Sequence, residues 1–418
     1  MDDVIGELQW RGLIGQSTDI AELRAALGAG PVTLYAGFDP TGPGLHIGHL
    51  ALMLTMRRLQ LAGHRPIGVV GGATGLIGDP SGKSAERTLH SREVVAGWVE
   101  RIRGEVGRFI DLSSGMVVNN LEWTGQLSAI DLLRDVGKHF SVNRMLDRDS
   151  VKARLTAGIS YTEFSYQLLQ ALDFLELYRR HGCTLQLGGS DQWGNLVAGI
   201  GLVRSVEGAT VHALAIPLIT KADGTKYGKT EGAAVWLSAD LMSPYAFYQF
   251  WLNLLDAEVP MMLRVFTFRS RAEILALEAA ARERPARREG QRVLAEDVTT
   301  LVHGAGECGR VVAASQALFG HAELAELDEG TLTAALAEVR PFRGRLGSVA
   351  SLMVAAGIVP TLSAARRAIA EGGAYLNNRR IISRDAVVAE SDLLHGRYLV
   401  LRRGKRTIGA VDVVPEGD

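Results

Sequence analysis

The sequence predicts an α/β fold: a Rossmann-like domain with a parallel sheet, then an α-helical domain and a small α+β domain. Short runs of β-forming residues alternate with helical patterns through the first half of the 418 residues. Alanine, leucine, arginine and glutamate then dominate with helical spacing from about 238 to 339. Short β-like runs return in the last 80 or so residues. These observations place the expected domains at 1–235, 236–340 and 341–418.

Four apolar runs are expected to be strands of the sheet: VTLYAGF (32–38), PIGVVGG (66–72), MVVNN (116–120) and CTLQLGG (183–189). Helical patterns such as 49–63 and 159–181 separate them. Strands that alternate with helices imply right-handed crossovers and a mainly parallel sheet. Ligands of such sheets bind at the carboxyl ends of the strands, near the point where strand order reverses.

Composition excludes several classes of protein. With 47% hydrophobic and 22% charged residues, the chain is expected to be globular and not disordered. It has no apolar run long enough to predict a membrane span, and its acidic start lacks the features of a secretory signal. Cys183 and Cys308 are isolated, which argues against disulfides and a cysteine-based zinc site. We therefore expect a cytoplasmic protein without a structural metal.

Charge is distributed unevenly along the chain. Residues 341–418 hold 12 Lys and Arg against 7 Asp and Glu, a net charge of +5. Residues 1–340 hold 33 against 39, a net charge of −6. A basic segment on an acidic body is typical of an appended nucleic-acid-binding module, but charge alone fits a solvated surface equally well.

The first motif that carries chemistry is LHIGHL at 45–50, directly after a predicted strand and a turn rich in Gly and Pro. It sets His46 and His49 on one face at the start of a helix, where free N–H groups favour anions. Gly48 would leave room for a ligand against the backbone. A helix cap with two incidental histidines is the alternative, but the spacing favours phosphate binding.

The second motif is Lys226-Tyr227-Gly228-Lys229-Thr230, which follows the β-like run HALAIPLIT and the turn KADG. Two flexible lysines can reach opposite oxygens of a pyrophosphate. Alone, this motif would predict no more than a solvated loop. Together and in this order, the two motifs resemble the HIGH and KMSKS signatures of class I aminoacyl-tRNA synthetases. The second has the KFGKT form of the bacterial tyrosyl enzymes, with tyrosine where phenylalanine is usual.

The resemblance to bacterial tyrosyl-tRNA synthetases covers nearly the whole chain. The blocks that carry it are YAGFDPTGPGLHIGHL, GGATGLIGDPSGKSAER, YTEFSYQLLQALDFLELY and LQLGGSDQWGN. It implies an enzyme that activates L-tyrosine with ATP and Mg²⁺ and transfers it to the terminal ribose of tRNA(Tyr). It also implies a homodimer, which nothing in the composition shows.

The resemblance also implies the residues that bind tyrosine. Tyr35 and Asp173 would read the phenol, Asp79, Tyr166 and Gln170 would hold the ammonium group, and Gln186 and Gln192 would lie near tyrosine and the adenylate. The spacing of Tyr166, Gln170 and Asp173 supports a lined pocket, since residues at i, i+4 and i+7 share one helical face. A half-exposed helix with ordinary polar positions is the alternative.

The ATP site is implied in the same way. Contacts to ribose and phosphates would come from Gly37, Asp39, Thr41, Gly48 and Asp191. The catalytic groups would be His46, His49 and Thr41, with Lys83, Arg87, Lys226, Lys229 and Thr230 on the pyrophosphate. The tyrosine carboxylate is already ionised at neutral pH, so catalysis would need positioning and charge stabilisation without a general base.

Ser348–Val413 resembles an S4-type RNA-binding domain. Arg366 and Arg367 lie on a predicted helix, and Arg379 and Arg380 on a β-like turn. Arginines grouped in this way suit phosphate contacts and stacking on RNA, and the helical middle domain would meet the anticodon region. The alternative is a small domain with solvated arginines.

Other nucleotide-binding motifs fail on spacing. GDPSGKS (78–84) has three residues between its glycines where a Walker A loop needs four, and Gly72, Gly75 and Gly78 lack the GxGxxG spacing. A catalytically silent, synthetase-like RNA-binding protein is a further alternative, but the intact histidines and lysines argue against it. A tryptophanyl enzyme is not expected to carry the S4-like segment or the Tyr35–Asp173 pair.

Overall fold

The computed structural model describes residues 3–81, 89–147, 151–152, 154, 158–220, 234–320, 322–404 and 407–414. The chain forms two compact units. The first contains Met1–Leu241 and Leu255–Pro285, and the second contains Met242–Leu254 and Ala286–Asp418. The helices between the predicted boundaries at 235 and 340 are thus shared between both units, and the division into three functional domains stays a prediction.

A six-stranded sheet forms the centre of the first unit, in the order β1-β6-β5-β2-β3-β4. All neighbouring strands are parallel except β1, which runs antiparallel to β6. The strands are β1 (Gln16–Ser17), β2 (Thr33–Phe38), β3 (Arg65–Val70), β4 (Met116–Asn119), β5 (Cys183–Gly189) and β6 (His212–Ile216). The four predicted strands therefore form, and the Rossmann-like parallel sheet is confirmed. Strand β1 was not predicted, because its two residues are too few to show an alternation.

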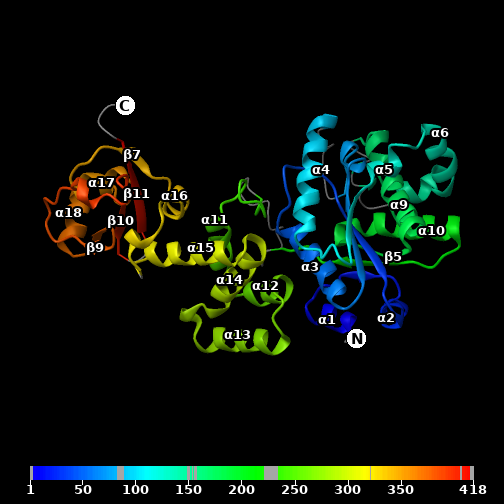
Figure 1. Cartoon of the computed structure of the whole chain (residues 1–418), viewed down its shortest axis with the longest axis horizontal. Helices are drawn as coiled ribbons and strands as arrows, with labels where there is room; N and C mark the ends of the chain where they lie inside the picture. The colour runs from blue at the N-terminus through cyan, green and yellow to red at the C-terminus, as the bar shows by residue number, and fades with distance from the viewer. Residues whose placement is uncertain are drawn as a thin grey trace. The chain divides into compact units, whose positions relative to one another are not determined.

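Helices cover both faces of this sheet (Figure 1). Helices α3 (Ile47–Leu61) and α4 (Arg92–Gly107) pack on β2, β3 and β4, while α9 (Tyr161–His181) and α10 (Trp193–Glu207) pack on β5 and β6. The central strands are buried because both faces are covered, which is why they read as apolar runs without alternation. The shorter helices of this part are α1 (Val4–Trp10), α2 (Ile20–Ala29), α5 (Leu121–Thr124), α6 (Ala129–Asp131) and α7 (Val142–Leu146).

Strand order reverses between β2 and β5. From β2 the chain adds β3 and β4 on one side, and from β5 it adds β6 on the other. The two strands are parallel, with Tyr35 of β2 opposite Gln186 of β5. Their carboxyl ends therefore meet at the switch point where ligands of doubly wound sheets bind.

Two helices beyond the sheet complete the first unit: α12 (Val259–Phe266) and α13 (Arg271–Glu283). The carboxyl end of α12 is closed by buried arginines from the Rossmann-like part. Arg11 donates to the carbonyl oxygens of Arg264 and Thr267, at 2.8 and 3.0 Å. Arg58 donates to those of Val265 and Thr267, at 2.9 and 2.7 Å. These bonds satisfy carbonyls that a helix end leaves without partners.

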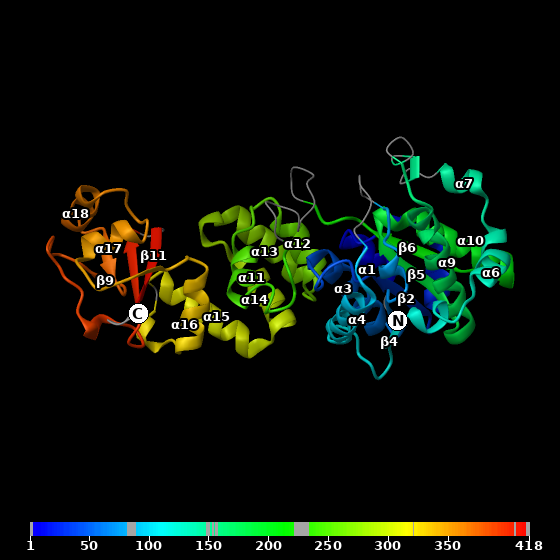
Figure 2. The same ribbon diagram turned by 90° about the horizontal axis from the view of Figure 1, so that it is seen from above.

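The second unit combines four helices with a small α+β module. The helices are α11 (Pro244–Leu252), α14 (Glu289–His303), α15 (Ala305–Leu318) and α16 (Glu329–Ala337). The module has a five-stranded sheet in the order β7-β11-β10-β8-β9. Its strands are β7 (Phe342–Gly344), β8 (Ala374–Leu376), β9 (Arg379–Arg380), β10 (Tyr398–Arg403) and β11 (Thr407–Val413). Helices α17 (Val349–Ala355) and α18 (Leu362–Ala370) lie beside them (Figures 1 and 2).

Asn377 and Asn378 form the two-residue turn between β8 and β9, both with positive φ of 45° and 65°. Asparagine tolerates this left-handed conformation, which tight hairpins require. The Asn378 amide also donates to the carbonyl of Ala317, at the end of α15, at 2.6 Å. The module is thus hydrogen-bonded to the helices of its own unit. Within the part of the chain that the structure describes, no helix has the length and apolar character needed to cross a membrane.

Candidate active site

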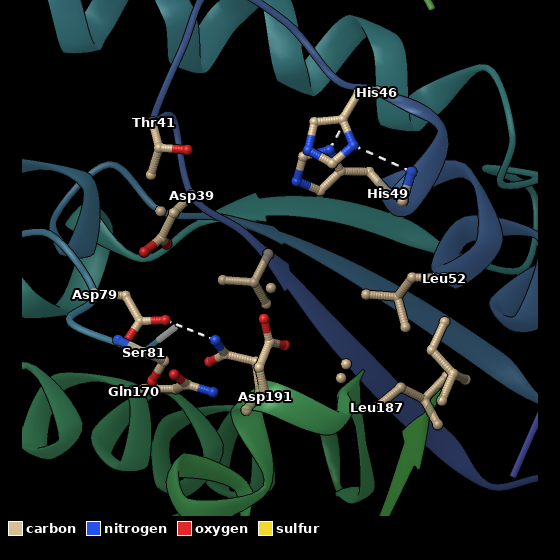
Figure 3. A pocket seen from close by; sticks show the side chains of 18 of the residues that line it. Asp39, Thr41, His46, His49, Leu52, Asp79, Ser81, Gln170, Leu187 and Asp191 are labelled. Atoms are coloured by element: carbon tan, nitrogen blue, oxygen red, sulfur yellow. Dashed lines mark hydrogen bonds between the residues drawn. The ribbon is translucent and has the colours of Figure 1, made fainter. Parts of the chain in front are cut away.

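A pocket of about 460 Å³ lies at the carboxyl ends of β2 and β5. It is of the size that small-molecule sites commonly have. Most of the predicted site residues line it: Tyr35, Gly37, Asp39, Thr41, His46, Gly48, His49, Asp79, Tyr166, Gln170, Asp173, Asp191 and Gln192. Figure 3 shows the two histidines on one side of the pocket and Asp79, Gln170 and Asp191 on the other.

The histidine pair caps the amino end of α3. Nδ1 of His46 accepts the backbone N–H of Gly48 at 3.1 Å, and Nδ1 of His49 accepts that of His46 at 3.1 Å. The two rings lie with their centroids 4.0 Å apart. Because both Nδ1 atoms accept hydrogen bonds, the neutral rings carry their proton on Nε2. The two histidines therefore do cap the helix, as the alternative interpretation expected. This cap uses only the Nδ1 atoms, so each neutral ring keeps an Nε2–H donor.

Burial keeps His49 neutral. It lowers the pKa of His49 well below its usual value, and the neighbouring His46 lowers it further. Neutral imidazoles can donate hydrogen bonds to developing negative charge without changing their own protonation state. His49 therefore keeps its Nε2–H donor throughout the neutral pH range.

Gly48 is needed for this cap. A Cβ atom at Gly48 would lie 2.9 Å from Cε1 of His46, closer than side chains approach. The room that Gly48 would leave for a ligand stays a prediction; the structure shows that Gly48 makes room for the His46 ring. At Gly37, in contrast, a Cβ would meet no atom within 4 Å, so the backbone there borders open pocket space.

Asp173 forms the buried end of the pocket. Its carboxylate accepts the indole N–H of Trp123 at 2.8 Å and the amide of Asn120 at 3.0 Å. Only 4% of its surface is exposed. Burial raises the pKa of Asp173 to about 7, although the two donors favour the ionised form.

The Tyr35 hydroxyl faces the same buried region. It has no hydrogen-bond partner among the described residues, although Tyr35 is only 1% exposed. Its ring packs on Phe174, with ring centroids 5.3 Å apart. Burial raises the pKa of Tyr35 well above its usual value, and the nearby Asp173 raises it further. A buried polar group without a partner is costly, so this hydroxyl is suited to meet a ligand.

A chain of hydrogen bonds joins the buried end to the first turn. Asn120 also donates to Thr74 at 3.0 Å, and Thr74 donates to Asp39 at 2.6 Å. The Tyr166 hydroxyl donates to the other oxygen of Asp39 at 2.6 Å. Burial and Asp39 raise the pKa of Tyr166 well above its usual value, so it stays a donor. Asp39 is thereby held in place from two sides.

A second network surrounds Asp79. Its carboxylate accepts the amide of Gln192 at 2.6 Å and the backbone N–H of Ser81 at 2.9 Å. The Gln192 oxygen in turn accepts from Asn195 at 3.1 Å. The side-chain oxygen of Gln170 is buried and has no partner among the described residues. Asp79 and Gln170 thus present acceptors on one side of the pocket (Figure 3).

Some predicted residues lie elsewhere. Gln186 does not line the pocket; it lies on β5 beside Tyr35 and is 1% exposed. Lys83, Arg87, Lys226, Lys229 and Thr230 fall outside the described residues. In the second unit, Arg366 and Arg367 are on α18 and Arg379 and Arg380 on β9, all exposed.

Asn120, Trp123 and Thr74 also belong to the site and were not predicted from the sequence. Asn120 was the easiest to find, because it directly follows β4 at the carboxyl edge of the sheet. Trp123 and Thr74 gave no comparable signal. Among the described residues, no group of three or more His, Cys, Asp or Glu side chains is arranged to hold a metal ion.

Residues 28–320 match the family described as "tRNA synthetases class I (W and Y)". A chain from Streptomyces coelicolor named tyrosine–tRNA ligase is 60% identical over 420 residues, which cover 99% of both chains. The chain belongs to the class I tyrosyl-tRNA synthetases. Its family assignment extends to the small module, since residues 342–409 match the "Tyrosine--tRNA ligase SYY-like C-terminal domain".

Two further members of this family are similar to the chain. The tyrosine–tRNA ligase of Streptomyces griseus is 58% identical over 424 residues, covering 100% of both chains. A C-terminally truncated mitochondrial tyrosyl-tRNA synthetase from Aspergillus nidulans has a TM-score of 0.70 and 28% identity. That match covers 76% of this chain and 95% of the other. The matches give no support to the catalytically silent alternative.

Proposed function

We propose that this pocket performs the activation step of a tyrosine–tRNA ligase and then passes the tyrosyl group to tRNA(Tyr). The observation that carries this proposal is the arrangement of polar groups in one pocket. A buried carboxylate lies at its closed end beside a hydroxyl that has no partner among the described residues, and two imidazole donors lie on its wall at a helix amino end. This arrangement suits a phenol at one end and a phosphate at the other.

The phenol of tyrosine would bind between Asp173 and Tyr35. Trp123 and Asn120 hold the carboxylate in place and still leave lone pairs for the phenol O–H. The Tyr35 hydroxyl would gain the partner that it lacks. Phenylalanine would leave the Tyr35 hydroxyl buried without a partner and would give Asp173 no further donor, so it would be rejected at a cost of about 1–3 kcal/mol for each lost hydrogen bond.

The amino group of tyrosine would bind near Asp79 and Gln170, with Tyr166 beside them. Asp79 supplies a carboxylate in a hydrogen-bonded position, and Gln170 supplies an oxygen without a partner among the described residues. An ammonium group has three donors and needs such acceptors. Gln192 would orient Asp79 and lie near the adenylate, whereas the buried Gln186 would act only through Tyr35.

ATP would enter as its magnesium complex. Hard-oxygen ligands suit Mg²⁺, which keeps phosphate and water ligands in such sites. The Nε2–H groups of His46 and His49 would donate to phosphate oxygens, with Thr41 beside them. Gly37 and Gly48 would let the nucleotide approach the backbone. Asp191, which is exposed where β5 ends, and Asp39 would accept from the ribose hydroxyls.

The chemical step would be an in-line displacement. An oxygen of the tyrosine carboxylate attacks the α-phosphorus of ATP, the bond to the bridging oxygen breaks, and pyrophosphate leaves with that electron pair. No proton transfer is needed, because the nucleophile is ionised. His46 and His49 would stabilise the added charge. Lys83, Arg87, Lys226, Lys229 and Thr230, which lie outside the described residues, would hold the pyrophosphate.

Recognition of tRNA(Tyr) would fall to the other parts of the chain. We assign catalysis to 1–235, contacts near the anticodon to 236–340, and RNA binding to 341–418. Exposed arginines on α18 and β9 support the last assignment, because Arg366, Arg367, Arg379 and Arg380 are all accessible to phosphates.

A homodimer in the cytoplasm completes the proposal. Large apolar side chains are exposed in the segment around α6 and α7, including Ile130 at 70%, Leu133 at 52% and Val142 at 58%. Tyr161, at the start of α9, is 68% exposed. Exposed apolar side chains concentrated in one segment are typical of an interaction surface, and a second copy of the chain is the partner that the family suggests.

The decisive experiment is ATP–pyrophosphate exchange with each of the twenty amino acids. Tyrosine alone should support exchange, and Asp173→Ala should lower kcat/KM for tyrosine by about 10²-fold, because a charge-assisted hydrogen bond is removed from a buried site. Glu207→Ala is the matched control: this carboxylate lies at the end of α10 and pairs with Arg179 at 2.7 Å. Exchange without tyrosine dependence, or an unchanged Asp173→Ala variant, would contradict the assignment.

A further inference from the structure

The chain that follows the second signature motif is paired with the first signature motif. The N–H of Ile47 donates to the carbonyl of Val235 at 3.1 Å, and the N–H of Leu237 donates to that of Leu45 at 2.9 Å. His46 and Trp236 thus form an antiparallel bridge. Their rings meet edge to face, with centroids 6.5 Å apart, and both line the pocket.

A carboxylate from a different helix holds the first motif from behind. Oε2 of Glu105, on α4, accepts the backbone N–H of Leu45 at 2.7 Å. Leu45 directly precedes His46, so this bond fixes the backbone from which the imidazole projects. Glu105 is only 6% exposed and does not line the pocket. Burying a charged carboxylate costs free energy, even when it accepts a backbone N–H, unless a positively charged group also pairs with it.

Arg101, one turn earlier on α4, supplies that pairing and extends it to the second segment. Its guanidinium lies 3.4 Å from Oε1 of Glu105. The same group donates to Ser238 at 2.7 Å and to Asp240 at 2.5 Å. Ser238 also donates to Asp240 at 2.6 Å, which fixes the carboxylate. Two neighbouring side chains of α4 therefore contact both segments.

The packing at this point leaves little freedom. A Cβ atom at Gly44 would lie 2.9 Å from the Leu241 side chain and 3.2 Å from Oε1 of Glu105. The backbone before the first motif is thus enclosed by α4 on one side and by the segment after Ser238 on the other. A substitution at Glu105 or Arg101 would therefore displace this backbone, because protein atoms and not solvent fill the space around it.

We propose that Glu105 and Arg101 are positioning residues for tyrosine activation, which hold the segments Leu45–Ile47 and Val235–Asp240 in the register that aims His46 at the phosphates. Neither side chain touches substrate. The inference rests on the proposed function, because it assigns these residues to the ATP half of that same pocket. The phenol end is built from Tyr35 on β2, Asp173 on α9 and the segment Asn120–Trp123 after β4, and its hydrogen bonds do not involve the pair.

This separation gives the pair a distinctive kinetic signature. A displacement of about 1 Å in a catalytic group can cost about 10²-fold in rate. Loss of the Glu105–Leu45 bond should therefore lower kcat for exchange and change KM for ATP. Tyrosine affinity should stay within about twofold, because the bonds to Asp173 and Asp79 are unchanged.

The test compares Glu105→Ala and Glu105→Gln with Arg101→Ala in ATP–pyrophosphate exchange, with tyrosine affinity measured separately by equilibrium dialysis. Glu105→Ala should lower kcat by about tenfold or more. Glu105→Gln keeps an oxygen for the Leu45 N–H but loses the charge that pairs with Arg101, so it should recover part of that loss. Arg101→Ala should cost at least as much as Glu105→Gln, since it breaks the ion pair and also removes the bonds to Ser238 and Asp240.

The control variant is Arg103→Ala, an exposed arginine on the same helix, which should change nothing. Equal losses of tyrosine affinity and kcat would overturn the proposal, since they would mark a general structural defect. So would full exchange activity in both Glu105→Ala and Arg101→Ala. If Glu105→Ala does not fold, Glu105→Gln and Arg101→Ala still decide the matter. Absence of tyrosine-dependent exchange in the unmodified protein would instead refute the proposed function.

Discussion

Asp173 shows how its surroundings set the chemistry of one side chain. Its burial raises the pKa to about 7, while Trp123 and Asn120 donate to both oxygens. The carboxyl group is therefore near the midpoint of its titration in neutral solution. The phenol of tyrosine would add a further donor, and donors favour the ionised form.

Tyrosine binding should consequently depend on pH. A ligand that donates to Asp173 binds the ionised form better, so its dissociation constant should rise as pH falls below about 7, by up to about tenfold per pH unit. Above that pH the constant should be level. Titration calorimetry between pH 5.5 and 8.5 measures this directly. Asp173→Asn should bind weakly at every pH without this slope, and a level profile in the unmodified protein would show that Asp173 does not titrate there.

Helix α12 illustrates how an element is fixed by groups far away in the sequence. Its last carbonyls are satisfied by Arg11 and Arg58, which precede their partners by 253 and 207 positions in the chain. Burial and the neighbouring Arg11 lower the pKa of Arg58 to about 9. The Arg58 guanidinium also lies 5.0 Å from the ring of Phe268. The helix therefore depends on two charged groups that are themselves expensive to bury.

Replacing Arg58 by methionine should destabilise the first unit. The stem is retained, but the carbonyl of Val265 loses its donor, which costs about 1–3 kcal/mol. We expect a lower midpoint in scanning calorimetry for the transition of this unit. Arg57→Met is the control, since the Arg57 side chain is 30% exposed and its nearest carboxylate, Asp111, is 4.0 Å away. Equal midpoints for both variants would mean that the α12 cap contributes nothing measurable.

The charge is distributed unevenly over the whole molecule, and this distribution agrees with the RNA-binding role proposed for residues 341–418. The net charge of +5 falls on residues 341–418, and the arginines on α18 and β9 are exposed. The second unit holds the module through Asn378 and through His395, which lies 2.8 Å from the carbonyl of Leu327. Deleting the small α+β module would remove these contacts and expose the helices that make them. Substitutions of single side chains therefore test its role in RNA binding better than a deletion.

The double variant Arg366→Ala/Arg367→Ala should weaken tRNA binding and leave ATP–pyrophosphate exchange unchanged. If each arginine neutralises one phosphate, the slope of log affinity against log salt should fall by about 1–2. Filter binding over a range of salt concentrations measures this slope. A variant without Arg24 and Arg103, exposed in the first unit, controls for the lost charge. The same slope in both variants would remove the special role of α18.

The sequence by itself was enough for the features that depend on local pattern. The apolar runs located β2 to β5, because strands covered on both faces contain few polar residues. The i, i+4, i+7 spacing placed Tyr166, Gln170 and Asp173 on one face of α9, and all three line the pocket. The spacing of His46 and His49 placed both rings at the start of α3. Each inference used a periodicity or a short motif whose geometry is the same in any protein.

The tertiary structure decided which distant groups meet. Asp173 pairs with Asn120 and Trp123, Leu45 with Glu105, and the end of α12 with Arg58, across 50 to 207 positions of the chain. Apart from Asn120, which directly follows a strand, these partners do not stand out in the sequence, because Glu105, Arg58 and Trp123 lie on helices without a motif around them. A buried donor or acceptor must find a partner within about 3 Å, and only the folded chain determines which residue is that close.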